Sequence, residues 1–501
     1  MNPDTTDPES LLDLNRLHLW NMASREEVHS GFHMPGHAGA RYFSEAYRNR
    51  IISLDTTELS SSDDLHDPKG PARLAMTESS RIYGSGETLF VTTGSTTGIQ
   101  VMLASICTPG TFLLLPRQVH FSVLHALALL DCPYAFISAS EWPYGQRGAG
   151  IFPPITGEQI RQSFLAYPQT TDVLLVSPDY YGQCADLAEL ADMVHSHGCR
   201  LLVDEAHGAH ITYLPADSLL DALSCHADIC VQSLHKTLPA LTMASQIHIS
   251  KEAIQQKRVS VQRVWDMLRL METSSPSFVI AASSEYAISW MDMYGRDAIY
   301  ERMKEVQRFL LRCEDIPGIR VFRSDTGSRQ DPMRIVLQVD PSVLFAPDLM
   351  AAMALVGTHI EFADLTRLVL IVSPWHQPQD LDSLFSILLT TVQSMTIEGA
   401  RTVKDAPILD QEMGRMMTCP SKPVIGLRDA IFGGHSRKQI DLSAATGEIC
   451  ASSVIPYPPG IPILWPGEMI SQEQVCLLER LCELEMTVRG VENGKIEVLY
   501  R

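Results

Sequence analysis

Two short groups of polar residues in the middle of the chain could perform chemistry. Ser233, His235 and Lys236 directly follow one apolar segment, and Asp204 ends another. A lysine just past a buried strand can act as a nucleophile if its surroundings lower its pKa, because only the neutral amine attacks a carbonyl. The ordinary alternative for any single lysine is a solvated surface position. Asp204 is placed to face a ligand, unless it only caps the helix that follows.

Two further polar sites occupy the same kind of position along the chain. Ser95, Thr96 and Thr97 follow an apolar segment and open a helical stretch. Hydroxyls and free backbone N–H groups at a helix N-terminus suit an anion such as a phosphate, although most such turns are simple caps. His120 comes after another apolar segment, where a lone histidine is more often structural.

A metal site near Asp204 also has to be considered, because Glu205, His207 and His210 follow it closely. Their order is not that of the H-E-x-x-H metalloproteases, and no further cluster of ligand residues lies nearby in the sequence. We therefore predict that the chain binds no metal.

The polar sites need a sheet to bring them together, and the hydrophobic pattern predicts one. From about residue 86, apolar strand-like segments alternate with amphipathic stretches. In one of these stretches Leu187, Leu190 and Val194 share a helical face, Gly198 is a plausible helix stop, and an apolar segment follows. Strand, helix, strand at this spacing predicts a βαβ unit and a mostly parallel sheet. The helix is expected at 186–197 and the strands at 88–92, 111–115, 134–138, 172–177, 200–204 and 228–232.

Changes of pattern along the chain predict four parts. The first looks like an arm, and the second is an α/β domain built on the sheet. Beyond it, a long helical pattern at 296–313 precedes strands at 333–339 and 368–372, which predicts a smaller α+β domain. The last part, also expected to be α+β, has a loop-rich stretch at 400–430 and a rigid proline-rich turn at 456–462. The predicted boundaries are 1–60, 61–295, 296–400 and 401–501.

The composition favours a globular protein with neither nucleic acid nor membrane as a partner. Of 501 residues, 45% are apolar, and 59 acidic against 39 basic residues give a net charge of −20, which repels nucleic acid and anionic membranes. The first nine residues are acidic and polar, unlike a signal peptide, and no apolar run approaches the roughly 18 residues of a membrane span. Eleven cysteines without a C-x-x-C pair favour reduced thiols and a cytoplasmic location.

Together the four polar sites match the needs of one cofactor, pyridoxal 5′-phosphate (PLP). PLP requires a phosphate cup, a carboxylate that keeps its pyridine nitrogen protonated, a flat group against its ring, and a lysine for covalent attachment. All four occur at the carboxyl ends of predicted strands, and Asp204 precedes Lys236 by one strand. The residues therefore predict a PLP enzyme.

Several longer stretches make the chain similar to one family, the ornithine/lysine/arginine decarboxylases of PLP fold type I. It resembles the short form of the family, which lacks an N-terminal wing domain. The matching stretches follow the family's order over nearly the whole chain. They are His33-Met34-Pro35-Gly36-His37, Thr93-Gly94-Ser95-Thr96, residues 117–120, Ser177-Pro178-Asp179-Tyr180-Tyr181-Gly182, residues 204–210, Ser233-Leu234-His235-Lys236-Thr237-Leu238, residues 273–277, residues 457–462 and Pro466-Gly467-Glu468.

The resemblance implies an aspartate-aminotransferase-like large domain and a role for each polar residue. Lys236 would attach the cofactor, Asp204 would pair with the pyridine nitrogen, and His120 and Ala206 would pack on the two ring faces. His207 is expected in the same site, where it or Lys236 would return a proton to the substrate carbon. The phosphate would be bound by Ser95, Thr96, Thr97, Ser233 and His235.

The resemblance also implies an oligomer and an amino-acid substrate. Ser274, in the stretch 273–277, would reach the cofactor of a neighbouring subunit, so we expect a homodimer or a higher homo-oligomer. The expected reaction is decarboxylation of arginine, lysine or ornithine. Another PLP reaction on the same scaffold, and a catalytically silent member that binds PLP and regulates a partner, are the alternatives.

Three departures from the family lie where substrate recognition is expected. The family usually has lysine, glutamine and glutamate where this chain has Ala38, Met243 and Ser452. A buried substrate cation needs a charge partner, and a serine hydroxyl cannot neutralise it. We therefore expect another acid to compensate, with Glu448 and Glu468 in the same segment as the candidates.

Overall fold

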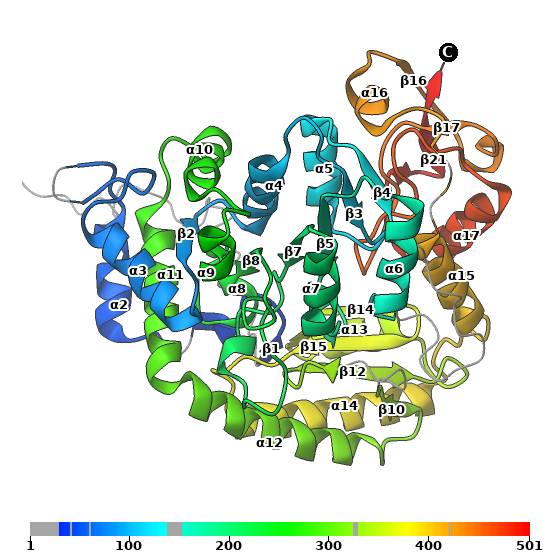
Figure 1. Ribbon diagram of the computed structural model, residues 1–501. Coiled ribbons are helices and arrows are strands. Elements are labelled where there is room, and N and C mark those ends of the chain that lie inside the picture. Colours follow the sequence, from blue (N-terminus) through cyan, green and yellow to red (C-terminus); the bar gives the residue numbers. More distant parts are fainter. Residues whose placement is uncertain are drawn as a thin grey trace, which may run out of the picture.

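The computed structural model (Figure 1) describes residues 30–40, 43–59, 62–137, 153–323, 329–419, 421 and 423–500. Most of the expected N-terminal arm and the last residue of the strand expected at 134–138 lie outside these ranges. In the described part of the arm, β1 (Ser30–Phe32) pairs in parallel with β13 (Thr358–Ile360), and α2 (Glu45–Arg50) follows; α3 (Pro71–Tyr83) comes after the predicted boundary at residue 60.

A seven-stranded sheet forms the centre of the large domain, which confirms the predicted α/β architecture (Figure 1). Five neighbouring strands run in parallel, and β9 is antiparallel to both of its neighbours. In sheet order the strands are β2 (Glu87–Val91), β9 (Ser245–Ile249), β8 (Ile229–Ser233), β7 (Arg200–Asp204), β5 (Asp172–Val176), β3 (Leu113–Leu115) and β4 (Tyr134–Phe136).

Each predicted strand of this sheet is present within two residues of its expected limits, whereas β9 was missed. Its sequence contains Ser245, Gln246 and His248, yet all of its residues are buried. Gln246 Nε2 donates to Gln232 Oε1 on the neighbouring strand at 3.0 Å, and His248 Nδ1 lies 2.8 Å from Thr88 Oγ1. Polar pairing between strands thus replaces the apolar pattern that marks the other strands.

Helices cover both faces of the sheet, so successive residues of a strand enter different cores. In β7, Leu202 packs with α4 (Ser95–Ile106), α5 (Phe121–Leu130) and α10 (Val261–Met271). Leu201 and Val203 pack on the opposite face with α6 (Gly157–Ala166) and α7 (Leu187–Ser196). This double cover explains the continuous apolar strands and leaves the strand ends as the place for polar side chains.

The small domain begins along a long helical run. Helix α11 (Phe278–Trp290) continues through a π turn (Met291–Gly295) into α12 (Arg296–Cys313), which confirms the helix expected at 296–313. The predicted domain boundary after residue 295 falls within this run. The antiparallel sheet has the order β10 (Ile319–Val321), β12 (Arg334–Val339), β15 (Arg367–Ile371) and β14 (Phe362–Ala363), with α13 (Ala346–Leu355) and α14 (Pro378–Glu398) beside it.

The C-terminal part has its own core and corrects one prediction. The stretch 400–430 is not loop-rich, because it contains α15 (Ala406–Thr418) and α16 (Leu427–Phe432). Leu409, Met413 and Met417 of α15 are buried against α17 (Gln472–Glu483), and the proline of α15 lies in its first turn, where a helix tolerates proline. A sheet of β16 (Ser436–Asp441), β21 (Lys495–Tyr500) and β17 (Ile449–Cys450) completes the core, and β20 (Val491–Glu492) pairs with β21.

Shorter elements join these units. They are β6 (Gln183–Cys184) with β11 (Arg329–Gln330), β18 (Ile455–Tyr457) with β19 (Thr487–Arg489), α8 (Leu234–Thr237) and α9 (Lys251–Gln255). Among the described helices, none is both long enough and apolar enough to cross a membrane.

Candidate active site

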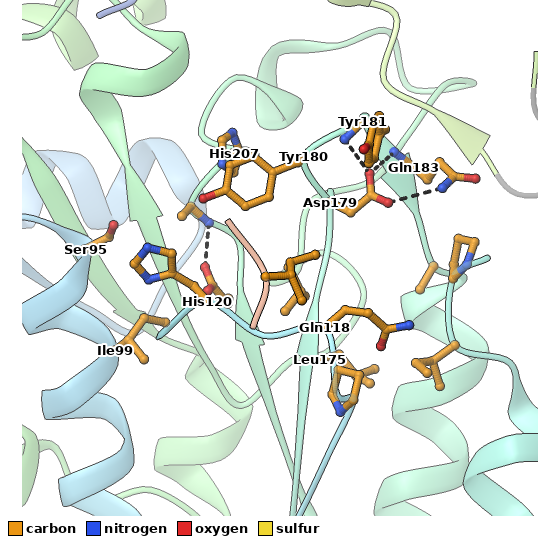
Figure 2. A pocket seen from close by; sticks show the side chains of 18 of the residues that line it. Ser95, Ile99, Gln118, His120, Leu175, Asp179, Tyr180, Tyr181, Gln183 and His207 are labelled. Atoms are coloured by element: carbon orange, nitrogen blue, oxygen red, sulfur yellow. Dashed lines mark hydrogen bonds between the residues drawn. The ribbon is translucent and has the colours of Figure 1, made fainter. Parts of the chain in front are cut away.

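A cavity lies at the carboxyl ends of β5 and β7, where the sequence predicts the reactive residues (Figure 2). Of the eleven predicted site residues, six line it: Ser95, His120, Asp204, Ala206, His207 and Lys236. Tyr180, Asp179 and Gln118 line it as well, together with Ile461 from the C-terminal proline-rich turn. The sheet therefore brings together residues that are up to 141 positions apart in the sequence (Ser95 to Lys236).

The other five predicted residues, Thr96, Thr97, Ser233, His235 and Ser274, do not line this cavity. Ser233 is nevertheless connected to it, because its hydroxyl donates to Ser95 Oγ at 2.6 Å. Thr96 and Thr97 lie in the first turn of α4, beside Ser95. Ser274 is exposed in the loop before α11. The phosphate-binding roles of these residues stay predictions.

The start of α4 has the form of an anion site. Gly94, with φ 89°, turns the chain from β2 into the helix, and the first turn of a helix has N–H groups without intrahelical partners. The preceding Thr92 and Thr93 are held by the buried Glu272, whose Oε1 accepts from Thr92 N at 2.6 Å and from Thr93 N at 3.2 Å. Glu272, which the sequence analysis missed, thus fixes the strand end from which the helix starts.

Asp204 is a buried carboxylate at the end of β7. Its Oδ1 accepts a hydrogen bond from Ala206 N at 3.1 Å. Burial raises its pKa, and the nearby charge of Lys236 acts in the opposite direction. A carboxylate in this setting is stabilised by a cationic partner.

Lys236 follows β8 in the short helix α8 and faces the cavity. Burial lowers its pKa to about 8, although Asp204 and Glu361 both act to raise it and Arg334 acts to lower it further. Its Nζ lies 3.1 Å from His207 Nε2 and 6.0 Å from the centre of the Tyr180 ring. A lysine with this pKa has a usable fraction of neutral amine near neutral pH, as a nucleophile requires.

The three histidines around Lys236 have lowered pKa values. Burial brings the pKa of His120 to about 3 and that of His235 to about 4, and it holds that of His207 well below 6.5. His120 caps α5 and places Nδ1 2.8 Å from Ser122 Oγ. His235 Nδ1 donates to the Ala244 carbonyl at 3.0 Å, which leaves Nε2 as an acceptor while the ring is neutral.

The stretch 33–37 packs directly on α8. Gly36 N donates to the His235 carbonyl at 2.7 Å, and a Cβ on Gly36 would lie 2.7 Å from the Leu238 carbonyl oxygen. Only glycine therefore allows this approach.

Comparison with known proteins identifies the family. The sequence profile described as "Orn/Lys/Arg decarboxylase, major domain" matches residues 18–337, and that of the family's C-terminal domain matches residues 420–494. The chain is 32% identical to the uncharacterized protein YaaO of Bacillus subtilis over 95% of both chains, and 29% identical to the arginine decarboxylase of the same organism, also over 95% of both. The constitutive lysine decarboxylase of E. coli has the same fold, with a TM-score of 0.74, 18% identity, and coverage of 98% of this chain and 82% of that one.

The chain belongs to the Orn/Lys/Arg decarboxylase family. It is therefore a PLP-dependent carboxy-lyase of fold type I, as the resemblance predicted. The cavity fits the cofactor: the start of α4 suits the phosphate, Asp204 suits a protonated pyridine nitrogen, and Lys236 has the lowered pKa that covalent attachment needs.

The two glutamates that we expected near the substrate's distal cation do not reach the cavity. Neither Glu448 nor Glu468 lines the cavity. Glu468 is buried and already paired, since its Oε2 accepts from Arg117 Nη2 and from Trp465 N, both at 2.8 Å. Glu448 is exposed. Glu468 is thus a structural partner of Arg117, and the expectation that it compensates for Ser452 was wrong.

Two residues without an assigned role in the sequence analysis stand close to Lys236. Arg334 begins β12 and places Nη2 3.1 Å from His207 Nδ1. Glu361, between β13 and β14, accepts from Met34 N at 2.9 Å and influences the pKa of both Lys236 and Tyr180. The only sequence signal for Arg334 was its position as a charged residue at the start of an apolar strand. No sequence signal marked Glu361.

Proposed function

We propose that the protein decarboxylates a basic amino acid, with arginine as the first candidate. The observation that carries the proposal is Lys236, with its lowered pKa, in one cavity with the buried Asp204. The arginine decarboxylases of Bacillus subtilis and Bacillus anthracis, at 29% and 27% identity over at least 93% of each chain, favour arginine over lysine and ornithine.

In this proposal the cofactor supplies an electron sink for the pair of electrons left when CO₂ departs. The chain's own residues prepare that chemistry. Asp204 would hold a proton on the ring nitrogen by charge pairing, Ser95 and the start of α4 would hold the phosphate, and His120 and Ala206 would pack against the ring. Lys236 would hold the cofactor covalently through its Nζ amine.

Proton return to the substrate carbon is assigned to Lys236. At neutral pH the imidazoles of His120, His207 and His235 are neutral, because burial lowers the pKa of each of them. Lys236, with a pKa of about 8, can both carry and lose a proton in that range. A neutral imidazole can still orient the lysine amine, and His207 Nε2 lies within hydrogen-bond distance of it.

The substrate's distal cation is assigned to Glu361. Its charge acts on both Lys236 and Tyr180, and it is held in place by Met34 N. Asp179 lines the cavity and Glu361 does not, but Asp179 already accepts hydrogen bonds from Tyr181 N, Gln183 N and Gln183 Nε2 at 2.8–3.2 Å. Glu361 therefore has the greater remaining capacity to pair with a guanidinium.

The active unit is proposed to be a homodimer or a higher homo-oligomer. Ser274 is exposed and does not line the cavity of its own chain, so its proposed contact with a cofactor phosphate needs a second subunit. Sedimentation and activity measured over the same dilution series test this: activity is expected to fall as the oligomer dissociates, and a fully active monomer would contradict it.

Incubation with a panel of amino acids and PLP, followed by mass spectrometry of the products, tests the reaction. Agmatine and CO₂ from arginine are the expected products, with lower yields of the amines from lysine and ornithine. Keto-acid products would indicate transamination or elimination instead. A yellow, PLP-loaded protein that changes no amino acid would indicate a binding protein without catalysis.

A further inference from the structure

A chain of two hydrogen bonds connects the small domain to the reactive lysine. Arg334, the first residue of β12, is 4% exposed and places Nη2 3.1 Å from His207 Nδ1. On the other side of the imidazole, Nε2 lies 3.1 Å from Lys236 Nζ. His207 is itself buried and packs at 4.8 Å between ring centres against Tyr180 (Figure 2).

The chemistry of the two neighbours fixes where the imidazole proton lies. A guanidinium has only donors, so Nδ1 of His207 has to accept from Arg334. A neutral imidazole that accepts at Nδ1 carries its proton on Nε2, and Nε2 then donates to the lysine. An ammonium has no lone pair, so this contact is satisfied only when Lys236 is a neutral amine.

We propose that Arg334 is a positioning residue that holds His207 as the neutral tautomer with its proton on Nε2, so that His207 donates to the neutral Lys236 amine. The proposal deepens the proposed function and rests on it, because Lys236 is the reactive group of that function. Without Arg334 the contact can reverse, with a Lys236 ammonium donating to Nε2 and the imidazole proton on Nδ1.

The charged groups around His207 and Lys236 agree with a neutral imidazole that donates to a neutral amine. For His207, burial, Lys236 and Arg334 are the main causes that lower its pKa, and His120 and His235 act in the same direction. For Lys236, burial and Arg334 lower the pKa, while the carboxylates Asp204 and Glu361 raise it. Arg334 thus opposes protonation of both members of the pair.

The fold holds Arg334 in place from two sides. Its backbone pairs with Ile371 of β15. Gly182, with φ +83°, lies against its side chain, and a Cβ there would be 2.6 Å from Arg334 Cβ. Gly182 ends the stretch 177–182, one of those that mark the family resemblance, so this stretch leaves the room that Arg334 needs to reach His207.

The tautomer can be observed directly by ¹⁵N NMR of the full-length, PLP-free protein labelled at histidine, with a His207→Asn spectrum for assignment. We expect wild-type His207 to carry its proton on Nε2, with Nδ1 unprotonated, at pH 9, where Lys236 with its pKa of about 8 is mostly the neutral amine. In Arg334→Met we expect a population protonated at Nδ1, and in Arg334→Lys a return to the wild-type pattern. A wild-type proton on Nδ1, or an unchanged pattern in Arg334→Met, would overturn the proposal.

The reactivity of Lys236 gives a second readout that needs neither substrate nor cofactor. Trace acetylation with acetic anhydride between pH 6 and pH 10, quantified on the Lys236 peptide, measures the fraction of neutral amine. In Arg334→Met the rate at pH 7 is expected to fall about tenfold, the effect of a rise of one unit in the lysine pKa. Arg302→Met is the matched control. Arg302 is also a buried arginine, but it donates to the His376 carbonyl at 2.7 Å, so its replacement should leave the Lys236 titration unchanged.

Equal titration of Lys236 in wild type and Arg334→Met would refute the proposal. If Arg334→Met does not fold, Arg334→Gln against Arg302→Gln repeats the comparison with a polar side chain that lacks the charge; the proposal then requires the Lys236 titration to shift in Arg334→Gln and to stay unchanged in Arg302→Gln. Because neither measurement uses an amino acid, a protein that fails to decarboxylate arginine can still pass both.

Discussion

The cofactor end and the substrate end of the cavity are built in different ways. At the cofactor end, Asp204 is the last residue of β7, and Lys236 lies just past the end of β8 in the same sheet. At the proposed substrate end, the groups come from separate parts of the fold. Ile461 of the C-terminal turn lines the cavity, whereas Glu361 of the small domain does not line it but acts on the pKa of Lys236 and is held by Met34 N of the N-terminal part. One end depends on local strand geometry and the other on how distant segments pack.

This difference explains why the two ends were not equally predictable. A reactive residue at the end of an apolar strand is visible in the sequence, and the parallel sheet then brings such ends together. The role of Glu468 could not be read in this way, because its partner Arg117 lies 351 positions away and the pair is buried only in the folded chain. The comparison predicts that changes at the cofactor end abolish the reaction, whereas changes at the substrate end alter its specificity.

Replacement of Lys236 tests the cofactor end most severely. Lys236→Ala is expected to lower kcat by about a thousandfold or more, because it removes both the covalent attachment and the proposed proton donor. Borohydride reduction of the wild type should label the Lys236 peptide, as mass spectrometry can show. Lys251→Ala, at an exposed lysine after β9, is the control. Near-normal turnover in Lys236→Ala would remove the basis of the site assignment.

The second prediction concerns the electron sink. Asp204→Asn is expected to keep the fold and to bind PLP, but to lower kcat by about 10²–10³-fold, because a neutral amide cannot stabilise a protonated pyridine nitrogen. Cofactor content, measured by absorbance, separates loss of binding from loss of chemistry. Asp204→Glu keeps the charge and should recover part of the rate. If Asp204→Asn retains wild-type kcat, another residue holds the ring nitrogen.

At the substrate end, Glu361→Gln is expected to lower kcat/KM for arginine about 10–100-fold, mostly through KM, because a buried guanidinium loses its charge partner. Steady-state kinetics with arginine and with a neutral analogue of the same length measure this, and the neutral analogue should be nearly unaffected. Glu448→Gln provides the matched control at an exposed glutamate. Equal losses of kcat/KM for arginine and for the neutral analogue would show that Glu361 shapes the site but does not pair with the substrate's charge.

A smaller effect is expected from pH at the cofactor end. Burial lowers the pKa of Lys236 to about 8, so the neutral, reactive amine is scarce below that pH and dominant above it. The rate of covalent PLP attachment to the PLP-free protein should therefore rise about tenfold from pH 7 to pH 9 and then level off. Stopped-flow absorbance can follow this, with the PLP concentration held fixed. A rate that still rises steeply at pH 10 would show an unperturbed lysine.

The same difference between local and long-range signals explains which elements of the fold could be predicted from the sequence. The strand at 200–204 and the helix at 296–313 were predicted with the bounds that the structure has, because each shows a clear hydrophobic period. Strand β9 and helix α15 were missed. Polar cross-strand pairs hide the first, and the apolar face of the second is buried against α17, a segment more than 50 positions away in the sequence. In the site, Arg334 and Glu361 were missed for a related reason: each acts through contacts with residues more than 120 positions away.

The smallest expected effect comes from Ser452, where the family usually has a glutamate. Ser452 is partly buried after β17 and does not line the cavity. If Glu361 already pairs with the substrate cation, Ser452→Glu should raise kcat/KM for arginine only about threefold in the wild type, since a second carboxylate adds little to a charge already neutralised. In a Glu361→Gln background the same change should recover more, and the double-mutant cycle measures that coupling. Absence of any recovery would show that position 452 of this chain does not reach the substrate, and that its substrate end depends on the small domain rather than on the C-terminal segment.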